Sequence, residues 1–149
     1  MLLNYLKSSS ASVLSSVFTF LVLAILFSPD FGLDDVPSEF YRYTFTATLF
    51  GYIGGLIAIW ILWLYQDKEV FTKDKIAIFA AGGLLIGIGL ELLTGFIGLP
   101  YFLISALVGA LMFLVMQKLN NKLLGWSIVA VHFGLLFIYP QVIDFFTFI

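Results

Sequence analysis

Two ionisable side chains lie in otherwise apolar surroundings and have the types that proton chemistry inside a membrane requires. Glu91 lies within Ile86–Thr94 among apolar and small residues, and His132 is the only histidine. A carboxyl beside an imidazole can relay protons, so Glu91 and His132 form the candidate intramembrane polar site. One glutamate and one histidine are too few ligands for a metal, so we expect neither a metal nor a cofactor.

Each of these residues also has a structural interpretation. At 1.5 Å per helical residue, Glu91 lies roughly 22 Å and His132 roughly 14 Å from the inner ends of their helices, so direct contact requires tilt or shifted boundaries. Glu91 is otherwise a protonated or snorkelling carboxyl that bonds a neighbouring helix or the headgroup zone. For His132 we favour a neutral histidine that bonds a carbonyl or hydroxyl between helices.

The sequence contains no set of side chains typical of an enzyme. There is no GxSxG, no HExxH, no pair of intramembrane aspartates and no Ser–Lys dyad within the apolar stretches. The chain has no cysteine, which excludes disulfides, thiolate metal sites and cysteine nucleophiles. The 7 Lys and Arg residues form no basic cluster suited to nucleic acid. We therefore expect a non-enzymatic protein without a nucleic-acid partner.

The composition identifies the solvent in which these residues must be positioned. Of the 149 residues, 62% are hydrophobic and 11% are charged, and the mean hydropathy is +1.10. Soluble domains usually carry about 25% charged residues, and a small domain cannot hide this much apolar surface from water. The sequence therefore predicts an all-α integral membrane bundle, with the lipid bilayer as its first partner.

Five transmembrane helices fit the chain as a single transmembrane domain over residues 1–149. Residues 76–116 carry one charge, Glu91. This stretch is too long for one span, so it predicts a hairpin that turns near Gly95, Gly98 and Pro100. The first apolar stretch follows Lys7 but lacks a small-x-small cleavage pattern, so we expect a retained span and no signal peptide. The expected spans cover about residues 9–27, 43–65, 76–94, 101–116 and 123–139.

The basic residues predict the orientation. With five spans, six of the seven basic residues lie on one side, which holds the N-terminus, Gln66–Lys75 and Gln117–Lys122. Arg42 alone lies on the other. Because cytoplasmic loops are rich in Lys and Arg, the N-terminus is predicted inside and the C-terminus outside. The other side also carries the acidic loop Ser28–Arg42, for which we favour a solvated loop over a cation site.

Small residues recur at helical spacing and predict close helix packing. For the first span, a polar pore lining is the alternative interpretation. The same faces offer contacts to a second copy or to another membrane protein. The residues are Ser8, Ser12, Ser15, Ser16 and Thr19 in the first span, Gly51 and Gly55 in the second, Gly83 and Gly87 in the third, and Ser105, Ala106, Gly109 and Ala110 in the fourth.

The run Gly98–Phe102, followed by Ser105-Ala106 and by Gln117-Lys118 at the end of the span, resembles small uncharacterised multi-span membrane proteins of Gram-positive bacteria. The similarity covers about 20 residues and is not a diagnostic motif. It implies a cell-membrane location and no assigned activity. Some small multi-span proteins of this kind act as immunity factors against membrane-acting toxins.

Two functions remain open from the sequence. The first is a non-enzymatic protein that binds a partner within the bilayer, as an accessory, assembly or immunity-type factor, which the short loops and small-residue helix faces favour. The alternative is a small oligomeric transporter or channel subunit that uses Glu91, with or without His132. Five helices are few for a self-contained transporter, so this alternative requires several copies or a partner.

Overall fold

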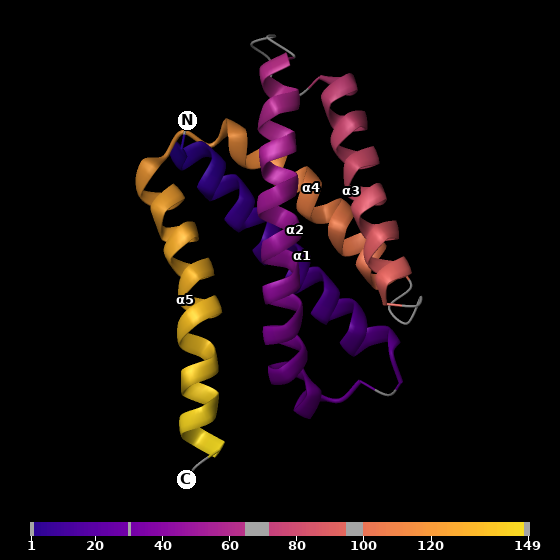
Figure 1. Ribbon diagram of the computed structural model, residues 1–149, viewed down its shortest axis with the longest axis vertical. Coiled ribbons are helices and arrows are strands. Elements are labelled where there is room, and N and C mark those ends of the chain that lie inside the picture. Colours follow the sequence, from indigo (N-terminus) through magenta and orange to yellow (C-terminus); the bar gives the residue numbers. More distant parts are fainter. Residues whose placement is uncertain (1, 30, 65–71, 95–99, 148–149) are drawn as a thin grey trace.

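The computed structural model describes residues 2–29, 31–64, 72–94 and 100–147, without side chains at 33 and 139–147. Within these ranges all regular elements are helices, and no strand occurs (Figure 1). Its elements are α1 (Leu2–Phe27), the short 3-10 helix η1 (Leu33–Asp35), α2 (Val36–Leu64), α3 (Lys73–Leu93), α4 (Tyr101–Lys118) and α5 (Lys122–Thr147).

Four of these helices, α1 to α4, are long and apolar enough to cross a membrane. Their lengths are 26, 29, 21 and 18 residues, compared with the roughly 20 that a bilayer core requires. The prediction of a multi-pass helical membrane protein is therefore confirmed in its general form. The fifth helix, α5, has 26 residues, of which the stretch Lys122–Ile138 is apolar.

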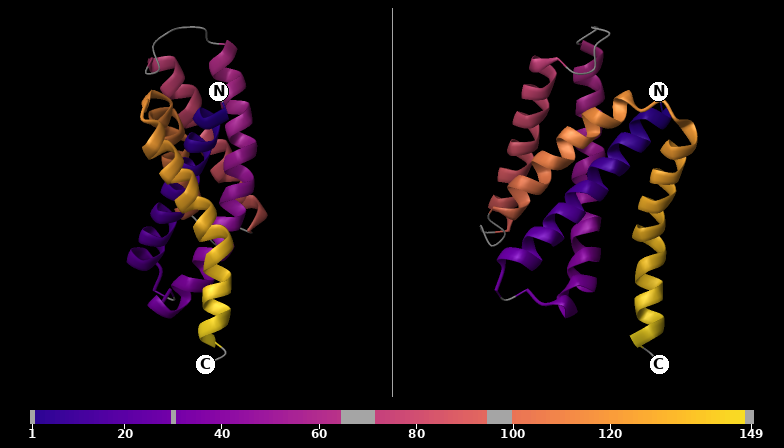
Figure 2. Two further views of the ribbon diagram at one scale, coloured as in Figure 1. Left: turned by 90° about the vertical axis from the view of Figure 1, so that its left-hand side faces the viewer. Right: turned by 180° about the vertical axis from the view of Figure 1, so that it is seen from behind.

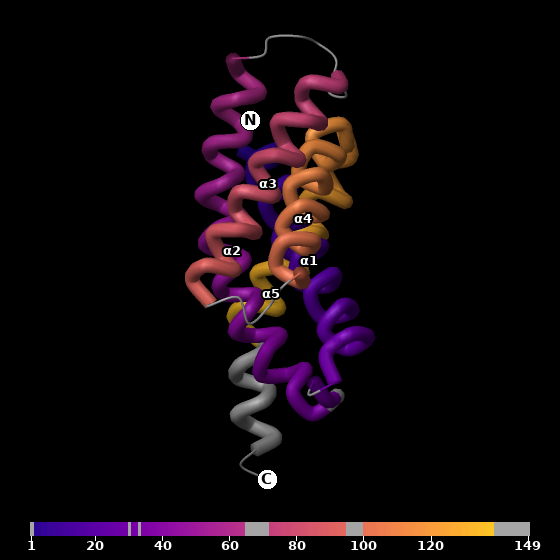
Figure 3. The backbone as a smooth tube through the Cα atoms, turned by 90° about the vertical axis from the view of Figure 1, so that its right-hand side faces the viewer, coloured from indigo at the N-terminus to yellow at the C-terminus, as the bar shows by residue number. Residues whose placement is uncertain are grey.

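The predicted hairpin within residues 76–116 is present as two helices. The third helix ends at Leu93, the fourth begins at Tyr101, and they pack against each other in opposite directions (Figure 3). The expected turn residues Gly95 and Gly98 lie outside the described residues, and Pro100 occupies the N-cap position of α4. A single long apolar stretch thus yields two membrane-length helices.

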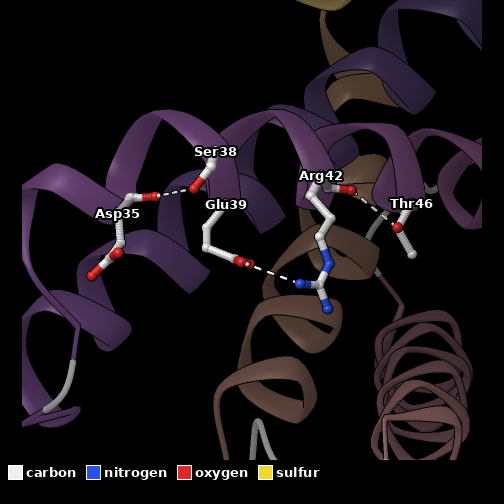
Figure 4. Close-up of polar contacts among 5 residues, drawn as sticks. All are labelled: Asp35, Ser38, Glu39, Arg42 and Thr46. Carbon is white, nitrogen blue, oxygen red and sulfur yellow. Dashed lines mark hydrogen bonds and ion pairs between the residues drawn. The ribbon is translucent and has the colours of Figure 1, made fainter.

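At the start of α2 the structure differs from the predicted boundary at Tyr43, because the helix begins at Val36. The acidic segment forms the beginning of the helix, where Asp and Glu interact favourably with the helix dipole. Local bonds order this end (Figure 4): the Ser38 hydroxyl donates to the Asp35 carbonyl at 3.0 Å, and Arg42 pairs with Glu39 at 3.2 Å. Much of the expected loop is therefore helical.

Two other boundaries also extend beyond the prediction. The first helix begins at Leu2 instead of Ser9, and it includes Lys7, whose amine donates to the Leu119 carbonyl just past α4. The last helix was expected to end at Tyr139 before Pro140, but it continues to Thr147. A proline inside a membrane helix removes one backbone hydrogen bond. The remaining hydrogen bonds of a long helix can keep the helix intact across that position.

The first helix is the centre of the bundle (Figures 1 and 2). It packs along α4, crosses α2 and meets α5, whereas α3 packs mainly on α4 and only weakly on α2. In Figure 1, α5 and α3 therefore lie on opposite sides of α1 and α2. One apolar cluster joins α1 to α2 and consists of Val13, Val17, Phe20, Leu21, Tyr43 and Ala47. A second, of Phe79, Phe113 and Leu114, joins α3 to α4.

Glycines set the closest helix contacts, as their spacing predicted. A Cβ atom at Gly87 would lie 2.7 Å from the Leu103 Cα, and one at Gly83 would lie 2.9 Å from the Leu107 Cα. These distances are too short for any side chain, so the backbones of α3 and α4 meet directly along this face. The predicted small-residue packing of the third and fourth spans is therefore confirmed.

Glycines also allow close helix contacts around α1. A Cβ at Gly51 would lie 2.6 Å from the Val13 side chain, and one at Gly55 would collide with the Ser9 hydroxyl. On the α4 side, Gly109 faces Ser12 and Ser16 with no room for a methyl group. The small residues of α2 and α4 thus let both helices approach the central helix.

Candidate functional site

His132 lies at the meeting point of α1, α2 and α5. Its side chain is fully buried, and both ring nitrogens have hydroxyl partners. The Nε2 atom lies 3.0 Å from the Thr48 hydroxyl on α2, and Nδ1 lies 3.2 Å from the Ser10 hydroxyl on α1. The Tyr52 ring stacks beside the imidazole at a centroid distance of 5.7 Å. This polar cluster of Ser10, Thr48, Tyr52 and His132 fastens α5 to the bundle.

The hydrogen-bond network assigns the tautomer of this imidazole. The Thr48 hydroxyl donates its only proton to the Thr44 carbonyl at 2.7 Å, so it must accept from His132 Nε2–H. The Nδ1 atom is then an acceptor for Ser10, whose oxygen lies 2.9 Å from the Tyr52 hydroxyl. The chain of donors ends on a backbone carbonyl, which cannot pass a proton onward. These bonds agree with a neutral, structural histidine between helices.

Glu91 occupies a different environment, on the face of α3 that Gly83 and Gly87 press against α4. The side chain is only 1% exposed. Its carboxyl faces the backbone N–H groups of Phe102 and Leu103, yet neither oxygen makes a hydrogen bond of normal geometry. These N–H groups belong to the first turn of α4, where intrahelical acceptors are missing and the dipole favours negative charge. Glu91 is thus placed to complete the amino end of α4.

A second polar cluster adjoins Glu91. The Tyr43 phenol on α2 lies within electrostatic range of the carboxyl and bonds the Ser105 hydroxyl of α4 at 2.7 Å. The Ser16 hydroxyl of α1 donates to the Ser105 carbonyl at 2.9 Å. Ser105 is completely buried, and so are nearly all of Tyr43 and Ser16. These bonds tie three helices together around one serine.

The structure does not bring Glu91 and His132 together as one site. Glu91 packs on the first turn of α4, whereas His132 bonds to α1 and α2, and no described hydrogen bond joins them. Neither of them lines the apolar groove between α2 and α3. A Glu–His proton relay therefore has no direct contact on which to operate among the described residues.

Sequence reasoning missed a polar contact at the N-terminal end of α1. Lys7 is 3% exposed and donates to the Leu119 carbonyl, and Gln117 donates to the Ser8 hydroxyl at 2.9 Å. A cation beside the final carbonyls of a helix is favourable because those acceptors lack intrahelical partners. The clue was available in the sequence, since Gln117 and Lys7 each lie at the predicted inner end of a span.

The serine stripe of α1 serves helix packing. Ser8 and Ser16 bond to α4, and Ser12 lies against Gly109, while Ser15 donates to the carbonyl of Ser12 within its own helix. Ser9 and Ser10 are also buried, against α2 and α5. Burial on all these sides agrees with the packing interpretation rather than with a polar pore lining.

An apolar groove lies between α2 and α3, which pack only weakly on each other. Its volume is about 290 Å³, and α1 and α4 contribute its floor. Among the residues that the structure describes, none that lines it is charged. Residues that line it include Ala47, Gly51, Gly54, Ile57, Gly82, Leu85, Ile86, Leu90, Ala106 and Ala110. We call this feature the α2–α3 groove.

Comparison with known proteins returns no relative. No family model, no curated protein and no solved structure matches this chain. Within the residues described by the structure, no group of three or more His, Asp or Glu side chains could hold a metal ion.

Proposed function

We propose that this protein is a non-enzymatic polytopic membrane protein that acts by binding a partner inside the bilayer, as an accessory, assembly or immunity-type factor. The observation that carries the proposal is the α2–α3 groove. It is lined by apolar and small side chains, and its walls include the exposed residues Ile57 and Leu85. A preformed, mostly apolar hollow is typical of a binding site.

The distribution of polar groups supports the same proposal. The described polar clusters around Ser10, Ser105 and Lys7 are engaged in bonds between the protein's own helices. The connections between helices are also short, and the segment from Lys118 to Lys122 is the shortest. Recognition of a water-soluble partner would need a larger polar surface, so the bilayer-facing groove is the better candidate.

We also propose that the chain crosses the cell membrane five times, with the N-terminus in the cytoplasm and the C-terminus outside. A 26-residue helix such as α5 measures about 39 Å, which exceeds a bilayer core of about 30 Å. Lys7 bonds beside the end of α4, close to Lys118 and Lys122, whereas Arg42 belongs to the opposite end of the bundle. This separation of basic residues supports a cytoplasmic N-terminus.

Photo-crosslinking in intact membranes tests the binding function. A photoreactive amino acid at Leu85, which lines the groove, is compared with one at Leu92, which is similarly exposed on the same helix but lies outside the groove. We expect an adduct of defined mass at Leu85 that Leu92 does not give. Identical products at both positions would remove the groove as a specific site.

A transporter or channel subunit is the second candidate, because Glu91 is a buried carboxyl without a hydrogen-bond partner. Intramembrane ionisable residues mark ion or proton paths in many membrane proteins. In vesicles that contain the purified protein, this candidate predicts a proton or cation flux that Glu91→Gln abolishes. Asp34→Asn, which alters an exposed carboxyl in η1, serves as the control. A flux unaffected by Glu91→Gln would exclude Glu91 from the mechanism.

A further inference from the structure

We propose that a polar pocket at one end of the bundle binds a phosphate group, either the headgroup of an anionic phospholipid or free phosphate. The pocket lies where the amino end of α1 meets the connection from α4 to α5 (Figure 2). It is separate from the α2–α3 groove, so the inference goes beyond the proposed function. The residues that line this Lys7–Lys122 pocket are Leu3, Asn4, Lys7, Asn120, Asn121 and Lys122.

The lining of the pocket favours an anion. The fold brings together two lysines that are far apart in the sequence, Lys7 and Lys122, and none of the described lining residues is acidic. Three asparagines add amide N–H donors. The side-chain oxygen of Asn121 accepts from the Leu124 amide at 3.2 Å, so the two N–H donors of its amide remain for a ligand. Ammonium and amide donors are complementary to the several acceptor oxygens of a phosphate group.

Lys7 is held in place by the protein itself. Its amine donates to the Leu119 carbonyl, and this bond uses one of the three ammonium protons. Its aliphatic stem packs on α5 at Gly125, where a Cβ would lie 3.3 Å from the Lys7 Cδ. The buried side chain is therefore ordered without a ligand. Binding to an ordered group costs little further conformational entropy, so Lys7 is preorganised for an anion.

The helix ends at the pocket agree with the same ligand. Lys122 is the first residue of α5, so the positive end of this helix dipole belongs to the pocket wall. The negative end of α4 is close by, but the Lys7 ammonium covers the Leu119 carbonyl there. The amino end of α5 therefore adds to the attraction that the two lysines exert on a phosphate.

The position of the pocket along the bundle suits a phosphate at the membrane surface. It lies at the end that two membrane-length helices, α1 and α4, share. Trp126, one turn after Lys122 on α5, is 54% exposed, and tryptophans of membrane helices gather at the level of the lipid headgroups. Basic pockets between membrane helices at this level bind phosphate-bearing headgroups. The lipid phosphates and the Lys7–Lys122 pocket therefore lie at the same depth.

The test uses the full chain, purified in dodecylmaltoside micelles. Native mass spectrometry measures the retention of dioleoylphosphatidylglycerol and of dioleoylphosphatidylcholine, which has the same chains but no net charge. A titration with inorganic phosphate, followed by phosphorus-31 NMR, tests the soluble source. We expect preferential retention of phosphatidylglycerol, and roughly fivefold weaker binding in Lys122→Gln, because one ammonium beside the phosphate is lost. Lys73→Gln is the matched control, since it removes the same charge from an exposed lysine at the start of α3, outside the pocket.

The outcomes identify the source of the phosphate. Binding of phosphatidylglycerol that falls in Lys122→Gln but not in Lys73→Gln supports a lipid headgroup in the pocket. If inorganic phosphate alone shows this dependence on Lys122, the pocket binds a soluble phosphate. Absence of binding to the wild type, equal losses in the two variants or no loss in either overturns the inference. Failure of the crosslink at Leu85 would leave this result unaffected, because Leu85 does not line the pocket.

Discussion

His132 and Glu91 are both buried ionisable residues, but their neighbours give them different roles. The imidazole has a hydroxyl partner on each nitrogen, and the bonds run in one direction to a backbone carbonyl. The carboxyl instead faces the unpaired amides at the start of α4 without a bond of normal geometry. A fully bonded group holds helices together, whereas an unbonded buried one retains the capacity to interact with something else.

At Thr48 we predict that replacement by valine weakens the attachment of α5 to α2. Thr48→Val removes the acceptor of His132 Nε2–H and should lower the free energy of unfolding by about 1 kcal/mol. Thr46→Val is the control, because Thr46 also donates to a carbonyl four residues earlier and is likewise partly buried, but it has no described contact with His132. Unfolding of the purified protein in mixed micelles measures both. An equal loss in the two variants would contradict the assigned role of His132.

The tautomer of His132 is a separate prediction. With Thr48 accepting from Nε2–H, the Nδ1 atom should carry no proton. Nitrogen-15 chemical shifts of the protein labelled at its single histidine distinguish the two ring atoms. A protonated Nδ1 beside an unprotonated Nε2 would reverse the chain of bonds and contradict the assignment.

At Glu91 we predict that the protein tolerates Glu91→Gln but is destabilised by Glu91→Lys. Glu91→Gln retains an oxygen that can face the amides of α4, so the free energy of unfolding should change by less than about 1 kcal/mol. Glu91→Lys places a cation against a helix amino end inside the bilayer, and should cost roughly 3 kcal/mol or more. Folded yield and unfolding in micelles report both effects, with Asp34→Lys at an exposed carboxyl of η1 as the control. Good tolerance of Glu91→Lys would contradict the location of the carboxyl beside α4.

At the scale of helices, the bundle depends on which glycines face a neighbour. Gly83 and Gly87 touch the α4 backbone, whereas Gly82 and Gly89 of the same helix face open space. Lipid tails are as apolar as leucine, so membrane helices associate through close packing and bonds between them. The division of one glycine-rich helix into a packed face and an open face therefore builds both the α3–α4 contact and the α2–α3 groove.

This division gives a prediction at the scale of the helix. Gly87→Ala forces a Cβ to within 2.7 Å of the Leu103 Cα, so α3 and α4 must separate. We expect a loss of about 2 kcal/mol in the free energy of unfolding. Gly89→Ala adds the same methyl group in open space and should be neutral or slightly stabilising, because alanine favours helices. Equal effects at the two positions would show that this face does not form the helix contact.

For the whole molecule, the path of α5 determines on which side of the membrane the C-terminus lies. It is fastened to α1 and α2 around His132, on the side opposite α3. If α5 crosses the bilayer, as proposed, the two termini lie on opposite sides.

The five-crossing proposal predicts the location of both ends. A phosphatase fused after Ile149 should be active, since it folds outside the cell, whereas a fluorescent protein at the same position should remain dark. The same reporters placed before Met1 should give the reverse result. A cytoplasmic C-terminus would contradict five crossings and leave the four helices α1 to α4 as the membrane domain.

The sequence by itself determined the solvent, the helical class and the existence of separate third and fourth helices. Continuous apolar runs identify membrane helices because unpaired backbone groups are too costly in lipid. The spacing of Gly51 with Gly55, and of Gly83 with Gly87, also predicted close helix contacts. These features depend on local composition and period, which are readable along the chain.

Only the tertiary structure decided which polar groups meet. Ser10, Thr48 and His132 are distant in sequence, and Lys7 meets Leu119 across 112 positions. The separation of Glu91 from His132, and the open face at Gly82, likewise depend on how each helix is rotated about its axis. Many rotations satisfy the same apolar pattern in lipid, because a membrane helix can be apolar on every side. Packing and hydrogen bonds between helices select one of them.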